Sequence, residues 1–370
     1  MIIRFLTHDD IAEHEKTASQ AFVSPCDVYD PGAVLPCEKV LGAFDDDNRT
    51  LFADLEIHEK KCNYDGKLLT CAGVGGVAAK PEHRGKGAVK ALFSRLFALP
   101  GYDVSVLYPF AEGYYRKFGY ERVGRSMSAT VPFSRLSDIK RNQDAKLYEG
   151  ENTERLLDIY NACVRQYNLS FVRENAEEFS SQPYISGNYT YIWKNGSLAT
   201  IRVDRAKSTV FVKELWFDSR ESMLGIVGFL RNFESNQKYV CFENIPESSP
   251  LPDFFRELKD CKITLHRMGS ARILDIGKIL GAHRYPPGDG EFTVGIGDEV
   301  FHVSYSENGV YTKKNAADGP DAVMDIGTAS RILLSGFADA AYVPGLTVIK
   351  PDSCFFNAFP PRTAFFTDSL

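Results

Sequence analysis

The chain has 370 residues, of which 44% are hydrophobic and 25% are charged. This balance is typical of a globular protein with two or three domains, and it excludes a largely disordered or fibrous chain. The formal net charge of −6 argues against a nucleic-acid partner, because phosphate binding needs clustered basic side chains, and it suits a cationic substrate better.

The cysteines and the hydropathy indicate a cytoplasmic protein. The eight cysteines are scattered without a C-x-x-C pair, so neither a zinc site nor a disulfide framework is expected. No apolar run approaches the roughly 18 residues of a membrane span. The first ten residues, MIIRFLTHDD, become acidic too early for a secretory signal peptide. We therefore expect reduced thiols and no membrane partner.

Residues 1–126 are predicted to form a mixed α/β sheet with helices packed on it. Thr7 is the expected N-cap of the first helix, with Asp9 and Asp10 in its positive first turn. The sequence Asn63-Tyr-Asp-Gly66 predicts a turn between two strands. In chain order the expected elements are a strand at 2–6, a helix at 7–22, strands at 51–60 and 67–79, a helix from 81 or 87 to 99, a strand at 104–108, a short helix, and a strand from 120.

Residues 127–285 partly repeat that order and are expected to form a degenerate second copy. The predicted elements are a helix at 154–167, a hairpin of 189–193 and 197–204, a strand at 209–217, a helix at 219–233, and a strand at 239–242. Asn195-Gly196 predicts a type I′ hairpin turn. The strand-to-helix junction after Asp218 has no glycine before Gly225, so no phosphate cradle is expected there. We interpret this region as packing support and one wall of a substrate cleft.

Residues 286–370 are predicted to be a small α+β domain that follows a Pro-Pro-Gly-Asp-Gly linker. Its expected elements are strands at 292–297, 300–306, 310–314 and 322–326 and an amphipathic helix at 328–337. The last residues of the chain are too apolar for a loose tail, and Phe355, Phe356, Phe365 and Phe366 are expected to anchor them.

The segment Arg84-Gly-Lys-Gly-Ala-Val89 is the clearest candidate for a binding loop. It lies between a predicted strand and a predicted helix. Glycines allow a ligand to approach the backbone, and the amides at a helix N-terminus point toward an anion such as a diphosphate. A solvated basic turn is the alternative, which the strand before and the helix after disfavour.

This segment resembles the pyrophosphate loop of the GNAT acetyltransferases, although Val89 departs from the glycine or alanine of that signature. The longer pattern Pro81-x-His83-Arg84-x-x-Gly87-x-x-Lys90-Ala91, followed by Leu107-Tyr108-Pro109 and Tyr115-Arg-Lys-Phe-Gly-Tyr120, resembles the Eis-type acetyltransferases. The resemblance covers essentially the whole chain, but its sharp motifs lie within residues 74–121. It implies an active GNAT domain, a degenerate GNAT domain, a sterol-carrier-like C-terminal domain and a homo-oligomer.

The same resemblance implies the roles of individual residues. The backbone of Val77, Ala78 and Ala79 is expected to hold the pantetheine amides of acetyl-CoA, and the residues expected to hold its diphosphate are Arg84, Gly85, Lys86, Gly87, Ala88 and Val89. Tyr115 is the expected acid for the leaving thiolate, and the C-terminal carboxylate of Leu370 is the expected base. Asp368 is a rival carboxylate. These roles suit direct transfer, since a phenol with a pKa of about 10 can protonate a thiolate and a largely protonated amine needs a base.

The implied function is an acetyl-CoA-dependent N-acetyltransferase acting on a small polycationic amine, such as an aminoglycoside. A non-catalytic acyl-CoA or lipid-binding sensor is the runner-up, and a structural assembly protein is a third possibility. Glu112 is read as a surface carboxylate, His83 as packing beside the loop, and the run 45–47 of aspartates as a solvated loop. Metal binding is not expected, because the remaining histidines have no partners at ligand spacing: His8, His14, His58, His266, His283 and His302.

Overall fold

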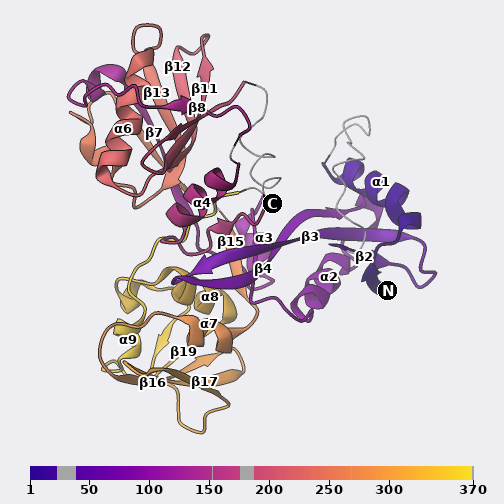
Figure 1. Cartoon of the computed structure of the whole chain (residues 1–370). Coiled ribbons are helices and arrows are strands. Elements are labelled where there is room, and N and C mark those ends of the chain that lie inside the picture. Colours follow the sequence, from indigo (N-terminus) through magenta and orange to yellow (C-terminus); the bar gives the residue numbers. More distant parts are fainter. Residues whose placement is uncertain (23–38, 152, 176–186, 268, 369–370) are drawn as a thin grey trace.

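The computed structural model describes residues 1–22, 39–151, 153–175, 187–267 and 269–368. Within these ranges the strands form three mixed sheets, and the chain has three lobes (Figure 1). The expected α/β and α+β fold class is therefore confirmed. The N-terminal lobe holds most of the first sheet, the second sheet forms a separate lobe, and the third sheet lies in the C-terminal lobe.

The first sheet has the order β1-β2-β3-β4-β5-β15-β6, and β9 pairs with β3. Its strands are β1 (Ile2–Phe5), β2 (Val40–Phe44), β3 (Leu51–Tyr64), β4 (Lys67–Ala79), β5 (Val104–Leu107), β6 (Glu121–Arg122), β9 (Phe171–Val172) and β15 (Ser270–Ile273). Most neighbours are antiparallel, but β4 and β5 are parallel. The strand β15 follows the second sheet in sequence, yet it pairs with β5 and β6 of the first sheet.

The second sheet has the order β14-β7-β13-β12-β11-β10-β8. Its strands are β7 (Arg125–Pro132), β8 (Lys146–Leu147), β10 (Tyr189–Trp193), β11 (Ser197–Asp204), β12 (Thr209–Trp216), β13 (Tyr239–Pro246) and β14 (Lys262–Arg267). The third sheet has the order β18-β17-β16-β19-β20. Its strands are β16 (Gly290–Ile296), β17 (Glu299–Ser306), β18 (Gly309–Lys314), β19 (Ala322–Met324) and β20 (Thr347–Val348).

Helices cover these sheets, and polar caps define several of their starts. The α-helices are α1 (Ile11–Phe22), α2 (Ala88–Phe97), α3 (Glu112–Arg116), α4 (Thr153–Val164), α6 (Arg220–Leu230), α7 (Ile276–Ala282), α8 (Ile326–Ser335) and α9 (Phe355–Ala358). The Asp10 carboxylate accepts hydrogen bonds from the amide and hydroxyl of Thr7, which closes the first turn before α1 as the sequence predicts. Ser219 and Asp325 cap α6 and α8 through their side chains.

The hairpin of β3 and β4 serves two hydrophobic cores. Its turn is the predicted one, and both Asp65 and Gly66 have positive φ, as a two-residue hairpin turn requires. The inner half of the hairpin packs with α2 in the core of the first lobe. The outer half, including Tyr64 and Leu69, belongs to the core that contains the third sheet and α8. The hairpin therefore joins the first and third lobes.

Two local predictions were wrong. The turn after β10 contains three residues, since Trp193 pairs with Ser197, and of its central residues Gly196 has positive φ but Asn195 does not; it is not a type I′ turn. The helix start at Pro81 is wrong and the start near Gly87 is right, because a short 3-10 turn ends at His83 and α2 begins at Ala88 with Gly87 as its N-cap. The glycines between them adopt positive φ, which breaks the helix and leaves a loop.

Candidate functional site

The site is built around the point where β4 and β5 separate. These parallel strands pair only from Cys71 with Val104 to Val74 with Leu107. The strand β4 continues to Ala79, but β5 ends at Leu107, so among the described residues 75–79 have strand β3 on one side and no strand on the other. Free backbone donors and acceptors along this edge can bind an extended ligand that contains amide groups. Val77, Ala78 and Ala79 all lie on this edge.

The loop that follows β4 offers a second set of backbone donors. Gly85 and Gly87 have φ of +80° and +83°, and Gly87 is the N-cap of α2. Within the described chain, the amides of residues 85–90 donate no hydrogen bond to another backbone group. Arg84 and Lys86 are exposed beside them. Exposed amides at a helix N-terminus with two adjacent cations fit a diphosphate, so the expected residues suit the phosphate groups of acetyl-CoA.

His83 lies beside the loop, as the sequence predicts, and packs there. Its ring centroid is 4.2 Å from that of Phe52, and its Nδ1 is 3.0 Å from Nζ of Lys86. The Lys86 ammonium also lies over the Phe52 ring. These contacts hold the loop against β3, and they give His83 a packing role.

Tyr115 lies on α3 and is 5% exposed. Its ring meets those of Phe93, Phe110 and Tyr120 edge-on, and it shares a core with Val74 and Leu107, the last paired residues of β4 and β5. Burial raises the pKa of Tyr115 to about 12. The phenol therefore remains protonated at neutral pH at a position next to the strand separation, and it can act as a proton donor there.

The C-terminal segment reaches the same region. The Tyr108 hydroxyl, just after β5, donates a 2.6 Å hydrogen bond to the carbonyl of Asp368. Phe365 and Phe366 are both 1% exposed, and Phe355 is fully buried, whereas Phe356 is only partly buried. Figure 1 shows this end of the chain in the middle of the molecule, close to α3 and β15. Leu370, the expected base, lies outside the described residues.

Asp368 is held by a buried arginine that the sequence analysis missed. Arg173 is 2% exposed, and its Nη2 lies 2.6 Å from Asp368 Oδ1 and 2.7 Å from Glu214 Oε1. Its guanidinium also lies over the Tyr160 ring. Glu214 is 41 residues and Asp368 195 residues from Arg173 in sequence, so no local spacing could have revealed this network. Asp368, proposed as a rival base, is thus engaged in an ion pair.

The other carboxylates lie as the sequence predicts. Glu112, read as a surface group, is partly exposed and pairs with Arg122 and Arg116. Asp47 accepts hydrogen bonds from the Arg49 and Thr50 amides within an exposed turn. In the described ranges no group of three or more His, Cys, Asp or Glu side chains is arranged to hold a metal ion. No helix there is long and apolar enough to cross a membrane.

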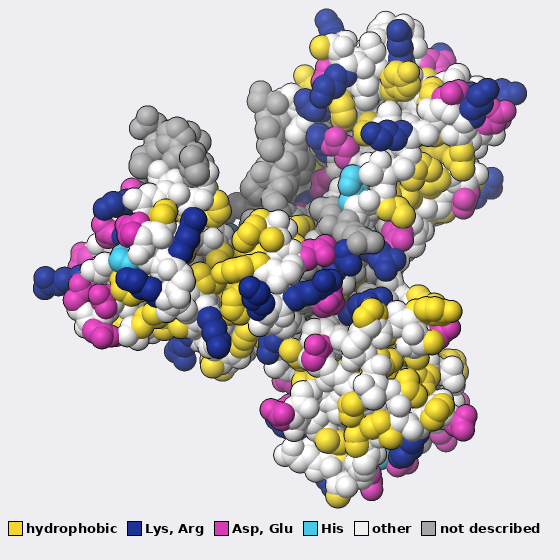
Figure 2. Space-filling model, turned by 180° about the vertical axis from the view of Figure 1, so that it is seen from behind, with side chains coloured by type: hydrophobic (Ala, Val, Ile, Leu, Met, Phe, Trp, Pro, Cys, Tyr) yellow, Lys and Arg dark blue, Asp and Glu magenta, His cyan; other side chains and the backbone are white. Residues whose placement is uncertain are grey.

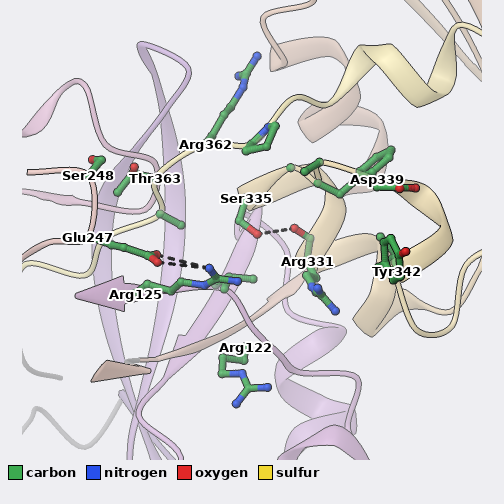
Figure 3. Close-up of a pocket in the computed structure, with 17 residues that line it drawn as sticks. Arg122, Arg125, Glu247, Ser248, Arg331, Ser335, Asp339, Tyr342, Arg362 and Thr363 are labelled. Atoms are coloured by element: carbon green, nitrogen blue, oxygen red, sulfur yellow. Dashed lines mark hydrogen bonds and ion pairs between the residues drawn. The ribbon is translucent and has the colours of Figure 1, made fainter. Parts of the chain in front are cut away.

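A separate cavity of about 530 Å³ lies where residues of all three regions meet (Figure 3). Arg122, Arg125 and Arg331 line it, together with residues 361–364 of the C-terminal segment. Arg125 lies 3.5 Å from Glu247, and Arg362 points away from the other arginines. Among the residues that the structure describes, no predicted site residue lines this cavity. It is therefore distinct from the strand separation between β4 and β5.

The face of the molecule shown in Figure 2 carries charges of both signs. On the face shown in Figure 2, Lys and Arg lie among Asp and Glu on the N-terminal lobe and on the lobe of the second sheet, whereas the C-terminal lobe shows mostly hydrophobic and uncharged surface. A continuous basic surface of the kind that phosphate backbones require is not seen on this face.

Comparisons with known proteins agree with this geometry. Residues 3–123 match the family model of the acetyltransferase (GNAT) domain. Among solved structures, a probable N-acyltransferase from Enterococcus faecalis V583 superposes with a TM-score of 0.85 at 16% identity, covering 100% of this chain and 99% of that one. Eis1 from Mycobacterium abscessus and a GCN5-related N-acetyltransferase from Anabaena variabilis each give 0.84, at 19% and 18% identity, with 100% of both chains covered. A search of curated proteins found no match.

Proposed function

Because residues 3–123 form a GNAT acetyltransferase domain, a type of domain that uses acetyl-CoA as co-substrate, we propose that this chain is an Eis-type N-acetyltransferase. It transfers the acetyl group directly to an amine of a small polycationic acceptor, such as an aminoglycoside. The observation that carries the proposal is the free edge of β4 that leads into a loop of unpaired amides at the start of α2. This combination suits pantetheine amides and a diphosphate on consecutive parts of one ligand.

Each group of the chain has a defined task in this proposal. When bound, acetyl-CoA supplies the acetyl group. The backbone of Val77–Ala79 binds and orients the pantetheine amides of acetyl-CoA. The loop Arg84–Val89 holds the negatively charged diphosphate. Tyr115 keeps a proton on Oη at neutral pH and donates it to the departing sulfur. Burial raises the pKa of this phenol to about 12, and the same burial would raise the proton affinity of the thiolate that forms beside it. The carboxylate of Leu370, delivered by the segment anchored at Tyr108, accepts the proton of the amine.

We propose that residues 127–285 are a degenerate GNAT domain and that residues 286–370 are a sterol-carrier-like domain. Support comes from the second sheet, in which α6 follows β12 as α2 follows β4, and from the parallel pairing of β12 with β13. The junction at Asp218–Ser222 is closed by its own side chains, since Ser222 donates to Asp218 and Ser219 caps the helix. We also propose that the protein is a cytoplasmic homo-oligomer.

A screen for CoA release tests the proposal. Purified protein with acetyl-CoA is presented with aminoglycosides, diamines and simple monoamines, and free thiol is measured. Release that depends on a polycationic amine is the expected result. Tight acetyl-CoA binding without release for any amine would instead support the non-catalytic acyl-CoA sensor. Absence of acetyl-CoA binding would overturn both readings.

A further inference from the structure

Four titratable side chains form a connected row on one face of β3 and α1. His58 Nε2 lies 3.2 Å from Glu56 Oε2, Glu56 Oε1 lies 4.0 Å from His14 Nε2, and His14 Nδ1 lies 2.9 Å from Asp54 Oδ2. The row runs from partly exposed to buried: the side chains of His58 and Glu56 are 23% and 26% exposed, and that of Asp54 is fully buried. These residues are not used by the acetyl-transfer scheme above.

Two glycines on the neighbouring strand make room for this row. Gly75 pairs with Glu56 across β3 and β4, and a Cβ on Gly75 would come within 2.8 Å of His58 Nε2. A Cβ on Gly76, which has a φ of +51°, would collide with the Glu56 carboxylate. Glu56 and His58 therefore lie across the backbone of β4. They do so directly before Val77, on the stretch where β4 has already separated from β5.

The row alternates carboxylates with imidazoles, and its solvent-facing end is formed by Glu56 and His58. Burial alone would lower the pKa of His14, but the hydrogen bond and charge of Asp54 and the charge of Glu56 raise it above its ordinary value. The buried Lys80 is paired with Glu13. Glu15 adds a further negative charge that faces His14. Asp54 Oδ1 is buried and accepts no hydrogen bond within the described chain. Burial raises the pKa of Asp54 to about 6, against the lowering effect of the His14 hydrogen bond and charge, and the Glu56 end of the row is the part that reaches solvent.

We infer that Glu56 is the residue that binds an ammonium group of the acceptor, with His58 beside it and the His14–Asp54 pair holding it in place. The inference rests on the proposed function, because it assigns one wall of the acceptor site to residues next to the acetyl-CoA edge of β4. Ammonium groups form charge-assisted hydrogen bonds with carboxylates, and a partly buried carboxylate binds them more strongly than an exposed one. A polycationic acceptor can place one amine at this wall while another amine reacts.

Glu56→Gln tests this role, and Glu59→Gln is the matched control. Both changes remove one carboxylate from β3, but Glu59 is exposed and accepts a hydrogen bond from Tyr102. The probe is tobramycin, titrated by calorimetry into the protein without acetyl-CoA. Loss of a charge-assisted hydrogen bond should weaken tobramycin binding about tenfold or more in Glu56→Gln and leave it unchanged in Glu59→Gln. Glu56→Asp should retain part of the affinity for tobramycin. His58→Gln should weaken tobramycin binding less than Glu56→Gln does.

The binding measurement separates this inference from the proposed function. One outcome is that the wild-type protein binds tobramycin and that Glu56→Gln weakens this binding, but that no acetyl group is transferred. Glu56 would then bind the ammonium group as inferred, and the proposed enzyme activity would be wrong. The opposite outcome is acetyl transfer with the same tobramycin affinity and the same KM in wild type, Glu56→Gln and Glu59→Gln. It would show that Glu56 does not bind the acceptor, and the proposed enzyme activity would be retained. A wild-type protein that does not bind tobramycin also contradicts the inferred role of Glu56. In every variant the affinity for acetyl-CoA should stay unchanged.

Discussion

At the scale of single residues, Tyr115 should behave as an acid and not as a packing residue. Tyr115→Phe keeps the ring among Phe93, Phe110 and Tyr120 and removes only the hydroxyl. Because a general acid contributes about 10² to 10⁴-fold, kcat should fall by that order while the KM for acetyl-CoA changes little. Steady-state kinetics with Tyr114→Phe as the control checks this. Wild-type turnover in Tyr115→Phe would leave the residue a packing role alone.

The second prediction for a single residue concerns the contribution of Arg173 to stability. Replacing it with Met leaves the partly buried carboxylates of Asp368 and Glu214 without their shared cation. Breaking a buried pair from one side typically costs about 3 to 5 kcal/mol, so the free energy of unfolding in urea should fall by that order. Arg165→Met, at an exposed position, is the control. Equal stability of the two variants would mean that the network contributes nothing to the fold.

At the scale of structural elements, the loop before α2 should control acetyl-CoA affinity. Gly87 has a φ of +83° and open space where a Cβ would stand, so Gly87→Trp strains the turn and covers the amides. Calorimetry should show acetyl-CoA binding weakened at least about tenfold. Gly225→Trp on α6 provides a control in the proposed degenerate copy. Unchanged binding in Gly87→Trp would remove the loop from the site.

The tip of the β3–β4 hairpin should make stability depend on acidic pH. Burial alone would raise the pKa of Asp65, but hydrogen bonds from His283 and the Arg284 amide and the charge of Arg362 lower it to about 2 from an ordinary value of 3.8. A pKa that is lower in the folded chain stabilises the fold above the unfolded value, and this stabilisation is lost as pH falls toward 2. The contribution of this shift to the free energy of unfolding at neutral pH is about 2 kcal/mol.

Asp65→Asn isolates that effect, since Asn tolerates the positive φ of this turn. Unfolding free energies of the wild type and Asp65→Asn should differ most near pH 6, and the difference should shrink as the pH falls from 5 to 2. Asp298→Asn, in the exposed turn between β16 and β17, is the control and should show no such trend. A difference that stays constant with pH would contradict the assigned shift.

The sequence predicted those elements whose signals are local. The hairpin turn at Asp65-Gly66, the glycines before α2 and the cap at Thr7 are short patterns with a direct physical cause, and the structure confirms them. The strand β15 and the Arg173 network could not be predicted, because their partners are distant in sequence. The same holds for the contact of His14 with Asp54, which lies forty residues away in sequence.

At the scale of the whole molecule, the C-terminal segment links all three regions. The Ala364 carbonyl accepts from the Arg125 amide, Phe365 packs with Trp216, and Phe366 packs with Tyr108. If the terminal carboxylate acts near Tyr115, a His tag fused directly to Leu370 should reduce turnover strongly and leave acetyl-CoA affinity intact. The same tag at Met1 is the control. Full activity of the C-terminally tagged enzyme would exclude Leu370 as the base.

The divided hairpin also affects the order in which the protein can be completed on the ribosome. Residues 51–79 leave the ribosome well before residues 286–366, which supply a large share of the core around Tyr64 and Leu69. Domains generally fold as they are synthesised, from the N-terminus onward. Here part of the core around the outer half of an early hairpin is completed only when residues 286–366 have been made. We therefore expect the nascent chain to present some apolar strand surface to chaperones and to neighbouring nascent chains until the C-terminal region has been made.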